Sequence, residues 1–210
     1  MNRRWRITVL AGVNGAGKSS VGGTAIRREG TDYWNPDEIA RAILESHPSM
    51  EVAEANAVAW QRGREHLETA IRTRRSFALE TTLGGRTITR TLVEGIARGA
   101  PVHVWYVGLE GVDLHIERVR KRVEQGGHDI PEAVVRSRYR TSRENLVRLM
   151  PVLERLIVYD NSAGPQPDGA VAPDHLLTMQ GGRIVTMKDL PEQPRWARPI
   201  IMTAVDLHGG

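Results

Sequence analysis

One eight-residue segment near the N-terminus constrains the fold more than any other feature of the chain. Residues 12–19 read Gly-Val-Asn-Gly-Ala-Gly-Lys-Ser, which matches the phosphate-loop pattern G-x-x-x-x-G-K-[ST] at every fixed position. The apolar stretch Arg6 to Leu10 predicts a buried strand before the loop, and Gly17 to Arg28 predicts a helix after it. Because this motif joins a strand to a helix, it predicts an α/β fold built on a parallel sheet.

The residue types of this segment suit the binding of nucleotide phosphates. Glycines let the backbone approach the phosphates closely, and the N–H groups of the loop and of the following helix point at the anion. In this pattern Lys18 reaches the β- and γ-phosphates and the hydroxyl of Ser19 binds Mg²⁺, so we expect ATP and Mg²⁺ as ligands. The residues expected to hold the nucleotide are Gly12, Asn14, Gly15, Ala16, Gly17, Lys18, Ser19 and Ser20.

The chain alternates strands with helices up to about residue 160. Further strands are expected at 33–35, 76–80, 102–107 and 156–159. Helices are expected at 36–47, 50–74, 86–98, 113–124 and 129–150, with Ser49, Asp113 and Asp129 as capping residues. This alternation predicts a P-loop kinase-like sheet of about five parallel strands with helices on both faces.

The last part of the chain has a different composition. Residues 161–173 are rich in Gly and Pro and predict a loop. Residues 175–179 and 183–187 predict a β-hairpin, and the tail beyond residue 191 shows little periodicity. We expect a kinase-type domain over residues 1–165, with residues 166–210 appended to it as a hairpin and tail.

Composition limits where such a protein works. The 210 residues include no cysteine, which excludes a disulfide framework and thiolate zinc sites. The sequence contains neither the apolar stretch of a signal peptide nor that of a membrane span, so we expect a cytoplasmic protein without a membrane partner. The net charge of +4 favours an anionic ligand, which includes nucleic acid as well as phosphorylated small molecules.

Two other classes of phosphate-loop protein do not fit the sequence. A GTPase carries the guanine-reading sequence Asn-Lys-x-Asp, which does not occur in this chain. A motor carries an apolar strand that ends in adjacent acids, whereas Leu156–Asp160 and Phe77–Glu80 each end in a single acid. The sequence therefore favours a kinase.

Acidic and hydroxyl side chains follow the second and third expected strands. Because parallel strands end at the edge that carries the phosphate loop, Asp37, Glu80 and Thr82 should meet there. Asp37 can accept the proton of an acceptor hydroxyl, the alternative being a structural role in the first turn of its helix. Glu80 and Thr82 suit the binding of substrate hydroxyls or the ordering of Mg²⁺ through water, the alternative being a cap for the next turn.

An arginine-rich segment, residues 118–140, has the pattern of a helical lid. Two expected helices flank the flexible stretch Gly126–Pro131, and closing such a lid would exclude water and bring guanidinium groups onto the phosphates. The catalytic arginines expected here are Arg122 and Arg136, with Arg138 and Arg140 as alternatives to the second. His128 is either a nucleotide sensor or a histidine bonded to backbone.

Five segments occur in the order and spacing of a known family. These segments are Gly12–Ser19, Asn35–Asp37, Phe77–Leu83, Arg122–Pro131 and Tyr159–Ser162. Together they resemble the short bacterial members of the zeta-toxin-like P-loop kinases. The resemblance implies a nucleoside-kinase-like fold, and the best-known members are toxins that phosphorylate UDP-N-acetylglucosamine at a sugar hydroxyl with ATP.

The resemblance assigns roles to the matching residues. It implies that Lys18 and Ser19 hold phosphate and Mg²⁺, that Asp37 is the base, and that Glu80 and Thr82 touch the substrate. It also implies that lid arginines stabilise the transferring phosphoryl group and that Tyr159–Ser162 flanks the adenine. The stretch between the phosphate loop and Asp37 is shorter than in the larger toxins, so the substrate need not be the same. An antitoxin is a candidate partner, although the sequence shows no antitoxin-binding feature.

The main hypothesis is therefore a kinase whose partner is a small-molecule hydroxyl acceptor. One alternative is a nucleic-acid kinase or nucleic-acid-binding ATPase, which the basic charge suggests. Nucleic acid is less favoured because aromatic residues make up only 5% of the chain, which leaves few stacking platforms. A second alternative is a nucleotide-gated interaction protein that binds ATP without transferring phosphate.

Overall fold

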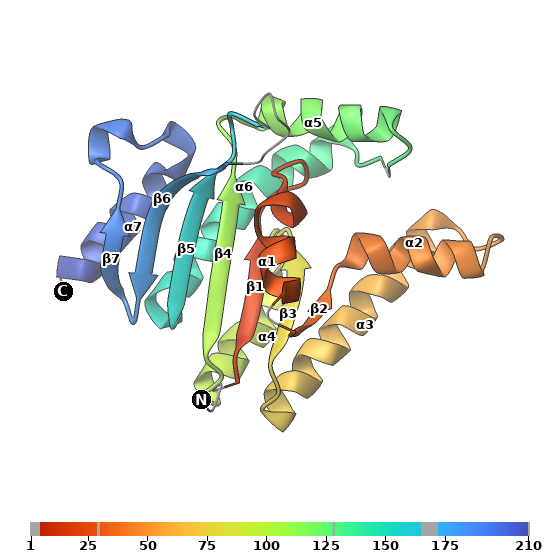
Figure 1. The fold of residues 1–210 in the computed structure, drawn as a ribbon, viewed down its shortest axis with the longest axis horizontal. Coiled ribbons are helices and arrows are strands. Elements are labelled where there is room, and N and C mark those ends of the chain that lie inside the picture. The colour runs from red at the N-terminus through yellow and green to blue at the C-terminus, as the bar shows by residue number, and fades with distance from the viewer. Residues whose placement is uncertain (1–4, 29, 128, 165–171, 210) are drawn as a thin grey trace.

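A seven-stranded sheet forms the centre of the molecule (Figure 1). The computed structural model describes residues 5–28, 30–127, 129–164 and 172–209. The strands are β1 (Ile7–Ala11), β2 (Asp32–Trp34), β3 (Phe77–Thr81), β4 (Val102–Gly108), β5 (Arg155–Asp160), β6 (Asp174–Gln180) and β7 (Arg183–Met187). Their order across the sheet is β2-β3-β1-β4-β5-β6-β7. The expected α/β sheet of five parallel strands is confirmed, and the two further strands are those of the predicted C-terminal hairpin.

The first five strands are parallel, and β1 lies between β3 and β4. The register pairs Ala11 at the end of β1 with Thr81 of β3 and Tyr106 of β4. The segment that leaves β1 therefore starts in the middle of the edge where the parallel strands end, with the chain after β3 on one side and the chain after β4 on the other.

The predicted hairpin is present, and it extends the central sheet. Strand β6 pairs antiparallel with β5, and β7 pairs antiparallel with β6. The tail then forms a helix, α7 (Arg198–Gly209), which the sequence analysis did not predict. Pro199 suggested punctuation, but it is the second residue of α7, where the missing N–H costs no helical hydrogen bond. Ile200, Ile201 and Ala204 of α7 are buried in the main core.

Helices cover the two faces of the sheet unequally (Figure 1). A π-helical turn, η1 (Ser19–Gly23), runs into α1 (Thr24–Arg28), which lies on one face. The other helices are α2 (Pro36–Ser46), α3 (Val52–Thr73), α4 (Arg86–Ala97), α5 (Val112–Glu124) and α6 (Glu132–Leu149), with 3₁₀ turns η2 (Met150–Val152), η3 (Leu190–Glu192) and η4 (Arg195–Ala197). Helices α4, α6 and α7 lie on the opposite face, while α5 crosses above the strand ends. None of the helices in the described ranges is long and apolar enough to cross a membrane.

The helix ends differ in detail from those predicted. Helix α3 begins after Glu51, so Ser49 does not cap it. Gly111 is the cap residue of α5, and Asp113 lies inside its first turn, where a carboxylate interacts favourably with the helix dipole. Helix α6 begins after Pro131, and the side chain of Asp129 instead accepts a hydrogen bond from the amide of Ile130. None of the three predicted residues therefore occupies the cap position, and none of the three observed cap residues makes a side-chain capping hydrogen bond.

Candidate functional site

The phosphate-loop segment turns sharply as it leaves β1. Gly12 has a φ of 148° and its amide donates to the carbonyl of Thr81 at 3.2 Å, which ties the loop to the end of β3. A Cβ atom at Gly12 would lie 2.2 Å from the carbonyl oxygen of Val107, so β4 requires glycine here. The strand–loop–helix context that the motif needs is therefore present, with η1 and α1 as the helical part.

The carboxylate of Glu80 lies against the two key side chains of the loop. Lys18 is 8% exposed, and its ammonium nitrogen lies 3.5 Å from Glu80 Oε1. Ser19 donates its hydroxyl proton to Glu80 Oε2 at 2.8 Å. A hydroxyl and a carboxylate oxygen are hard oxygen ligands of the kind that Mg²⁺ prefers. Glu80 therefore lies beside the two side chains to which the sequence motif assigns phosphate and Mg²⁺.

Two further donors hold Glu80, and sequence reasoning identified neither as a site residue. Tyr33 donates its hydroxyl proton to Glu80 Oε2 at 2.7 Å, and the amide of Asn35 lies 3.4 Å from the same oxygen. Burial of Tyr33, together with the negative charge of Glu80, raises the pKa of the phenol, which therefore remains a proton donor. The guanidinium of Arg27 covers the Tyr33 ring at 4.4 Å from its centroid.

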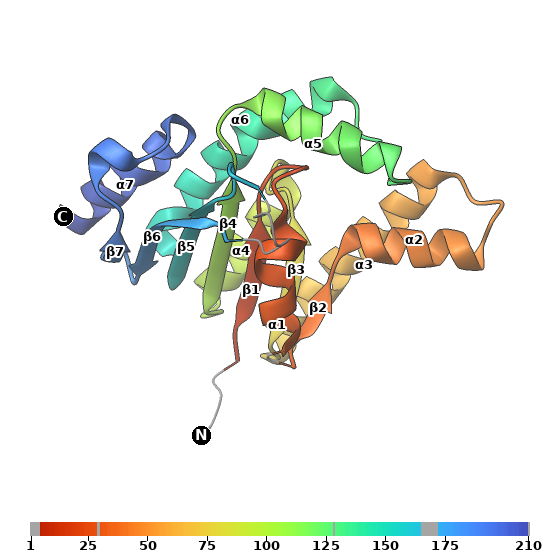
Figure 2. The ribbon, with the colours of Figure 1, turned by 45° about the horizontal axis from the view of Figure 1, so that its top comes forward.

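Asp37 is connected to this cluster through Asn35. The side-chain oxygen of Asn35 caps α2 by accepting from the amide of Asp37 at 3.0 Å, while its amide group faces Glu80. The carboxylate of Asp37 is 53% exposed, and its Oδ2 lies 3.3 Å from Nη1 of Arg122 on α5. Figure 2 shows the end of α5 above the α2–α3 pair, and this ion pair connects α5 to α2. Two of the predicted catalytic residues are therefore in contact.

Asn14 connects the phosphate loop to both helices of the predicted lid. Arg138 of α6 donates to its side-chain oxygen at 2.9 Å, and His115 of α5 lies with Nδ1 2.8 Å from its carbonyl oxygen. A carbonyl only accepts, so Nδ1 carries the proton. Burial, with Lys18 and Arg118 nearby, lowers the pKa of His115 to about 4. His115 is therefore a neutral donor, and no sequence motif pointed to it.

The lid arginines occupy different environments. Arg136 binds Asp113 at 2.9 Å and lies 3.8 Å from Glu132, and Arg140 lies 3.9 Å from Glu144. Arg138, which the sequence analysis named as an alternative, reaches the phosphate loop through Asn14, whereas the first choice, Arg136, pairs with carboxylates of α5 and α6. Two residues along a helix turn the side chain by about 200°, so Arg136 and Arg138 face different partners. His128 lies outside the described residues.

Thr82 contributes to local structure at the end of β3. Its hydroxyl oxygen lies 3.4 Å from the amide of Gly84, and its carbonyl accepts from Ser142 of α6 at 2.6 Å. This pattern matches the alternative role of a hydroxyl that stabilises the turn. Ser20 is exposed at the start of η1, beside Ser19.

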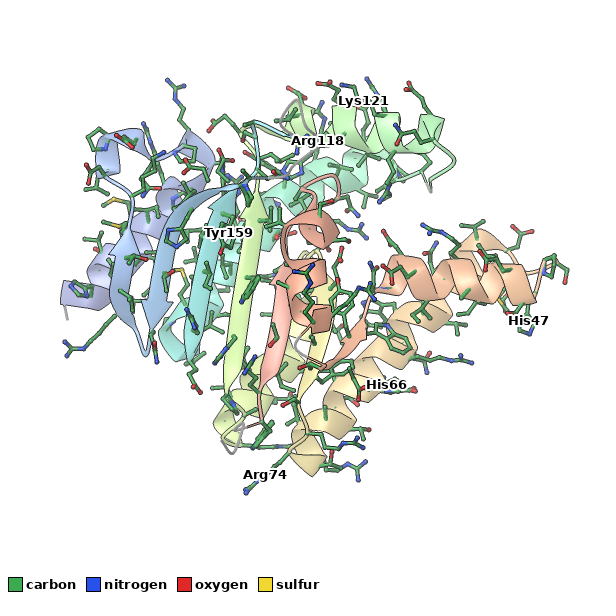
Figure 3. The ribbon with its side chains drawn as sticks, in the orientation of Figure 1. His47, His66, Arg74, Arg118, Lys121 and Tyr159 are labelled. Carbon is green, nitrogen blue, oxygen red and sulfur yellow. The ribbon has the colours of Figure 1, made fainter. Side chains whose placement is uncertain are left out.

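The segment after β5 supports the phosphate loop from the other side. Asn161 donates its amide to the carbonyl of Ala16 at 3.0 Å, and a Cβ at Gly17 would lie 2.5 Å from that amide nitrogen. Arg118 of α5 donates to the carbonyl of Ser162 at 3.0 Å. Figure 3 places Arg118 and Tyr159 near the upper end of the sheet, far from Arg74 at its opposite edge. The phosphate loop, helices α5 and α6, and the end of β5 are thus connected by side-chain hydrogen bonds.

The chain is similar in sequence to a known protein family and to a protein of Haemophilus influenzae. The family model AAA_33, described as an AAA domain, matches residues 7–146. An uncharacterized protein of Haemophilus influenzae is 30% identical over 135 residues, covering 61% of this chain and 88% of that protein.

Solved structures with the same fold include two forms of one complex and a toxin–antitoxin system. A chain of the AvrRxo1-ORF1:AvrRxo1-ORF2 complex with sulphate ions has a TM-score of 0.64 at 15% identity, covering 90% of this chain and 62% of that one. A chain of the same complex with ATP has a TM-score of 0.63 at 14% identity, covering 97% of this chain and 64% of that one. A chain of the PezAT toxin–antitoxin system of Streptococcus pneumoniae has a TM-score of 0.60 at 13% identity, covering 99% of this chain and 87% of that one.

The protein thus spans less than two thirds of these two AvrRxo1 chains, and identities this low show the shared P-loop kinase-like fold alone. The matching family model, in contrast, runs from β1 through the phosphate loop into α6. The chain therefore belongs to the AAA_33 family of AAA domains.

Proposed function

We propose that this protein is an ATP-dependent kinase that transfers the γ-phosphoryl group to a hydroxyl of a small molecule. The observation that carries the proposal is the position of Asn35. One end of this side chain fixes the amide of Asp37, and the other faces Glu80, which contacts Lys18 and Ser19. A carboxylate suited to proton abstraction is therefore tied to the residues that would hold the triphosphate.

In the proposed reaction the loop amides and Lys18 hold the β- and γ-phosphates. Ser19 and Glu80 would hold Mg²⁺, a pairing consistent with an ion that usually takes few protein ligands and completes its shell with water and phosphate oxygens. When bound, this ion neutralises charge on the phosphates. Tyr33 and Asn35 keep the Glu80 carboxylate oriented toward the loop.

Asp37 acts as the base in this proposal. The acceptor oxygen attacks the γ-phosphorus, the bond to the β-phosphate oxygen breaks, ADP leaves, and the hydroxyl proton passes to Asp37. The half-exposed carboxylate leaves room for an acceptor to approach from solvent. Arg122 and Arg138 would stabilise negative charge on the transferring group, Arg122 beside Asp37 and Arg138 beside the loop.

The acceptor is proposed as a class only. A UDP-N-acetylsugar is one candidate, supported by the resemblance to zeta toxins. The fold shared with a chain of the PezAT toxin–antitoxin system supports an antitoxin as a candidate partner. We propose the cytoplasm as the location, because a chain without cysteine suits a reducing compartment.

A transfer assay with a matched pair of variants tests the proposal. The protein is incubated with γ-labelled ATP, Mg²⁺ and a small-molecule extract, and the labelled product is identified by mass. Asp37→Asn should lower transfer by about 10²–10⁴-fold while ATP still binds. Asp113→Asn is the control, because Asp113 is also an exposed carboxylate in the first turn of a helix.

Three other results would each contradict the proposal. Full transfer by Asp37→Asn would exclude Asp37 as the base. Transfer to RNA or DNA oligonucleotides in place of small molecules, with affinity that falls steeply with salt, would indicate a nucleic-acid kinase. Tight ATP binding without transfer to any acceptor would indicate a nucleotide-gated interaction protein.

A further inference from the structure

A tryptophan from the C-terminal segment lies against the strand ends that border the site. Trp196 of η4 is 3% exposed and lies outside the residues that the family model matches. Its ring covers Gly108 at the end of β4 so closely that a Cβ there would lie 2.3 Å from a ring carbon. Its indole Nε1 donates to Asp160 Oδ1, at the end of β5, at 3.1 Å. One side chain thus contacts the ends of both strands.

The same carboxylate oxygen receives a second donor. Ser162 donates its hydroxyl proton to Asp160 Oδ1 at 2.6 Å and accepts from the amide of Glu110 at 2.7 Å. The carbonyl of Gly108 accepts from the amide of Asn161 at 3.0 Å. Hydrogen bonds therefore fix residues 160–162 on both sides, with Trp196 at the outer end of the network.

The inner end of this network contacts the nucleotide site. Asn161 is 5% exposed and donates to the carbonyl of Ala16 in the phosphate loop, and the carbonyl of Ser162 accepts from Arg118 of α5. A shift of residues 160–162 would move the side-chain amide of Asn161, which supports the loop at Ala16. This amide lies so close to Gly17 that even an added Cβ atom would not fit between them. The position of Trp196 is thus linked to the shape of the loop through a short series of polar contacts.

We infer that Trp196 is a positioning residue for nucleotide binding, acting through its indole N–H on Asp160 and through Asp160 on the segment that supports the phosphate loop. The inference rests on the proposed function, because it requires that this loop binds ATP. It gives the C-terminal segment a part in the site beyond extending the sheet.

The competing explanation is that Trp196 only fills the core, since its ring also packs 6.1 Å from that of Tyr106. Trp196→Phe keeps an aromatic ring in the core but removes both the N–H and the ring atoms that cover Gly108. Ser162→Ala separates the two explanations, because it removes a donor to the same Asp160 oxygen and leaves the Trp196 ring in place. The chain offers a matched control in Trp34, whose ring lies against Gly63 and whose Nε1 donates to the carbonyl of Ala59 at 3.2 Å.

The experiment is a calorimetric titration of Mg²⁺–ATP into wild type, Trp196→Phe, Trp34→Phe and Ser162→Ala, well below each melting temperature. We expect Trp196→Phe and Ser162→Ala to raise the Kd for ATP about fivefold, the effect of losing one net hydrogen bond, and Trp34→Phe to leave it within about twofold. Melting temperatures should fall similarly in both tryptophan variants. If Trp196→Phe does not fold, Ser162→Ala decides.

Two results would overturn the inference. The first is an unchanged Kd in Trp196→Phe, or in Ser162→Ala if that variant decides. The second is an equal loss of affinity in Trp34→Phe, which would indicate general loosening of the fold. Absence of ATP binding by the wild type would instead contradict the proposed function itself, so the two failures can be told apart.

Discussion

The buried histidine beneath the phosphate loop predicts a specific dependence of stability on pH. His115 is 1% exposed and donates to the carbonyl of Asn14. Burial is the main cause that lowers its pKa to about 4, and the positive charges of Lys18, Arg118 and Arg143 act in the same direction. In the unfolded chain a histidine has a pKa of about 6.5. Between these two values the unfolded state binds the proton and the folded state does not.

The sign and size follow from this difference. Above about pH 6.5 His115 is neutral in both the folded and the unfolded state, so it does not change the free energy of unfolding. As the pH falls toward about 4, protonation of the unfolded chain lowers the free energy of unfolding, by about 3 kcal/mol once the pH reaches the folded pKa. Below that pH the histidine contributes no further loss.

His115→Asn isolates this contribution, because an asparagine amide can replace Nδ1–H as donor to Asn14 without titrating. We expect the free energy of unfolding, measured with urea, to fall between about pH 7 and about pH 4.5 in both proteins. The fall should be roughly 2–3 kcal/mol larger in the wild type than in the variant. Carboxylates that titrate in both proteins cancel in the difference. Parallel stability curves for the two proteins would refute the assignment of a neutral, buried His115.

Three further substitutions test other parts of the site. Arg138→Ala should lower kcat about 100-fold and Arg136→Ala should leave it nearly unchanged, because the first guanidinium reaches the phosphate loop and the second binds Asp113; equal losses in steady-state kinetics would contradict this. Tyr33→Phe should raise the Mg²⁺ concentration needed for half-maximal ATP binding about tenfold, because Glu80 loses a donor. Tyr106→Phe, which loses a hydroxyl bonded to Ser142, is its control and should not change that concentration. Gly17→Ala should fold but show no ATP binding by calorimetry, since its φ of 80° and the nearby Asn161 amide exclude a Cβ; retained binding would count against the loop geometry.

The sequence predicted the fold well where local patterns decide it. The phosphate-loop motif and the apolar residues 102–107 identified strands β1 and β4, and the alternation of strands and helices predicted that the sheet is parallel. The same reasoning missed α7, because the prolines of the tail indicated a loop, whereas burial of Ile200, Ile201 and Ala204 in the core stabilises a helix there. Periodicity also could not tell that the hairpin would pair with β5.

The candidate site was predictable in its residue types but not in its contacts. Asp37 and Glu80 could be placed because parallel strands end at one edge. The choice between Arg136 and Arg138 depended on how α6 is rotated against the loop, which spacing along one helix does not fix. His115 and Trp196 belong to no motif, and they reach the site only through packing between segments far apart in the chain.

Binding of ATP at the phosphate loop is the central claim, and calorimetry tests it most directly. Titration of Mg²⁺–ATP into folded wild-type protein should release or absorb heat that fits one site. Lys18→Ala should abolish this signal without unfolding the protein, because in the proposed site the ammonium group next to Glu80 would be the loop's charged contact to phosphate. No heat with the wild type, or an unchanged isotherm with Lys18→Ala, would contradict the claim.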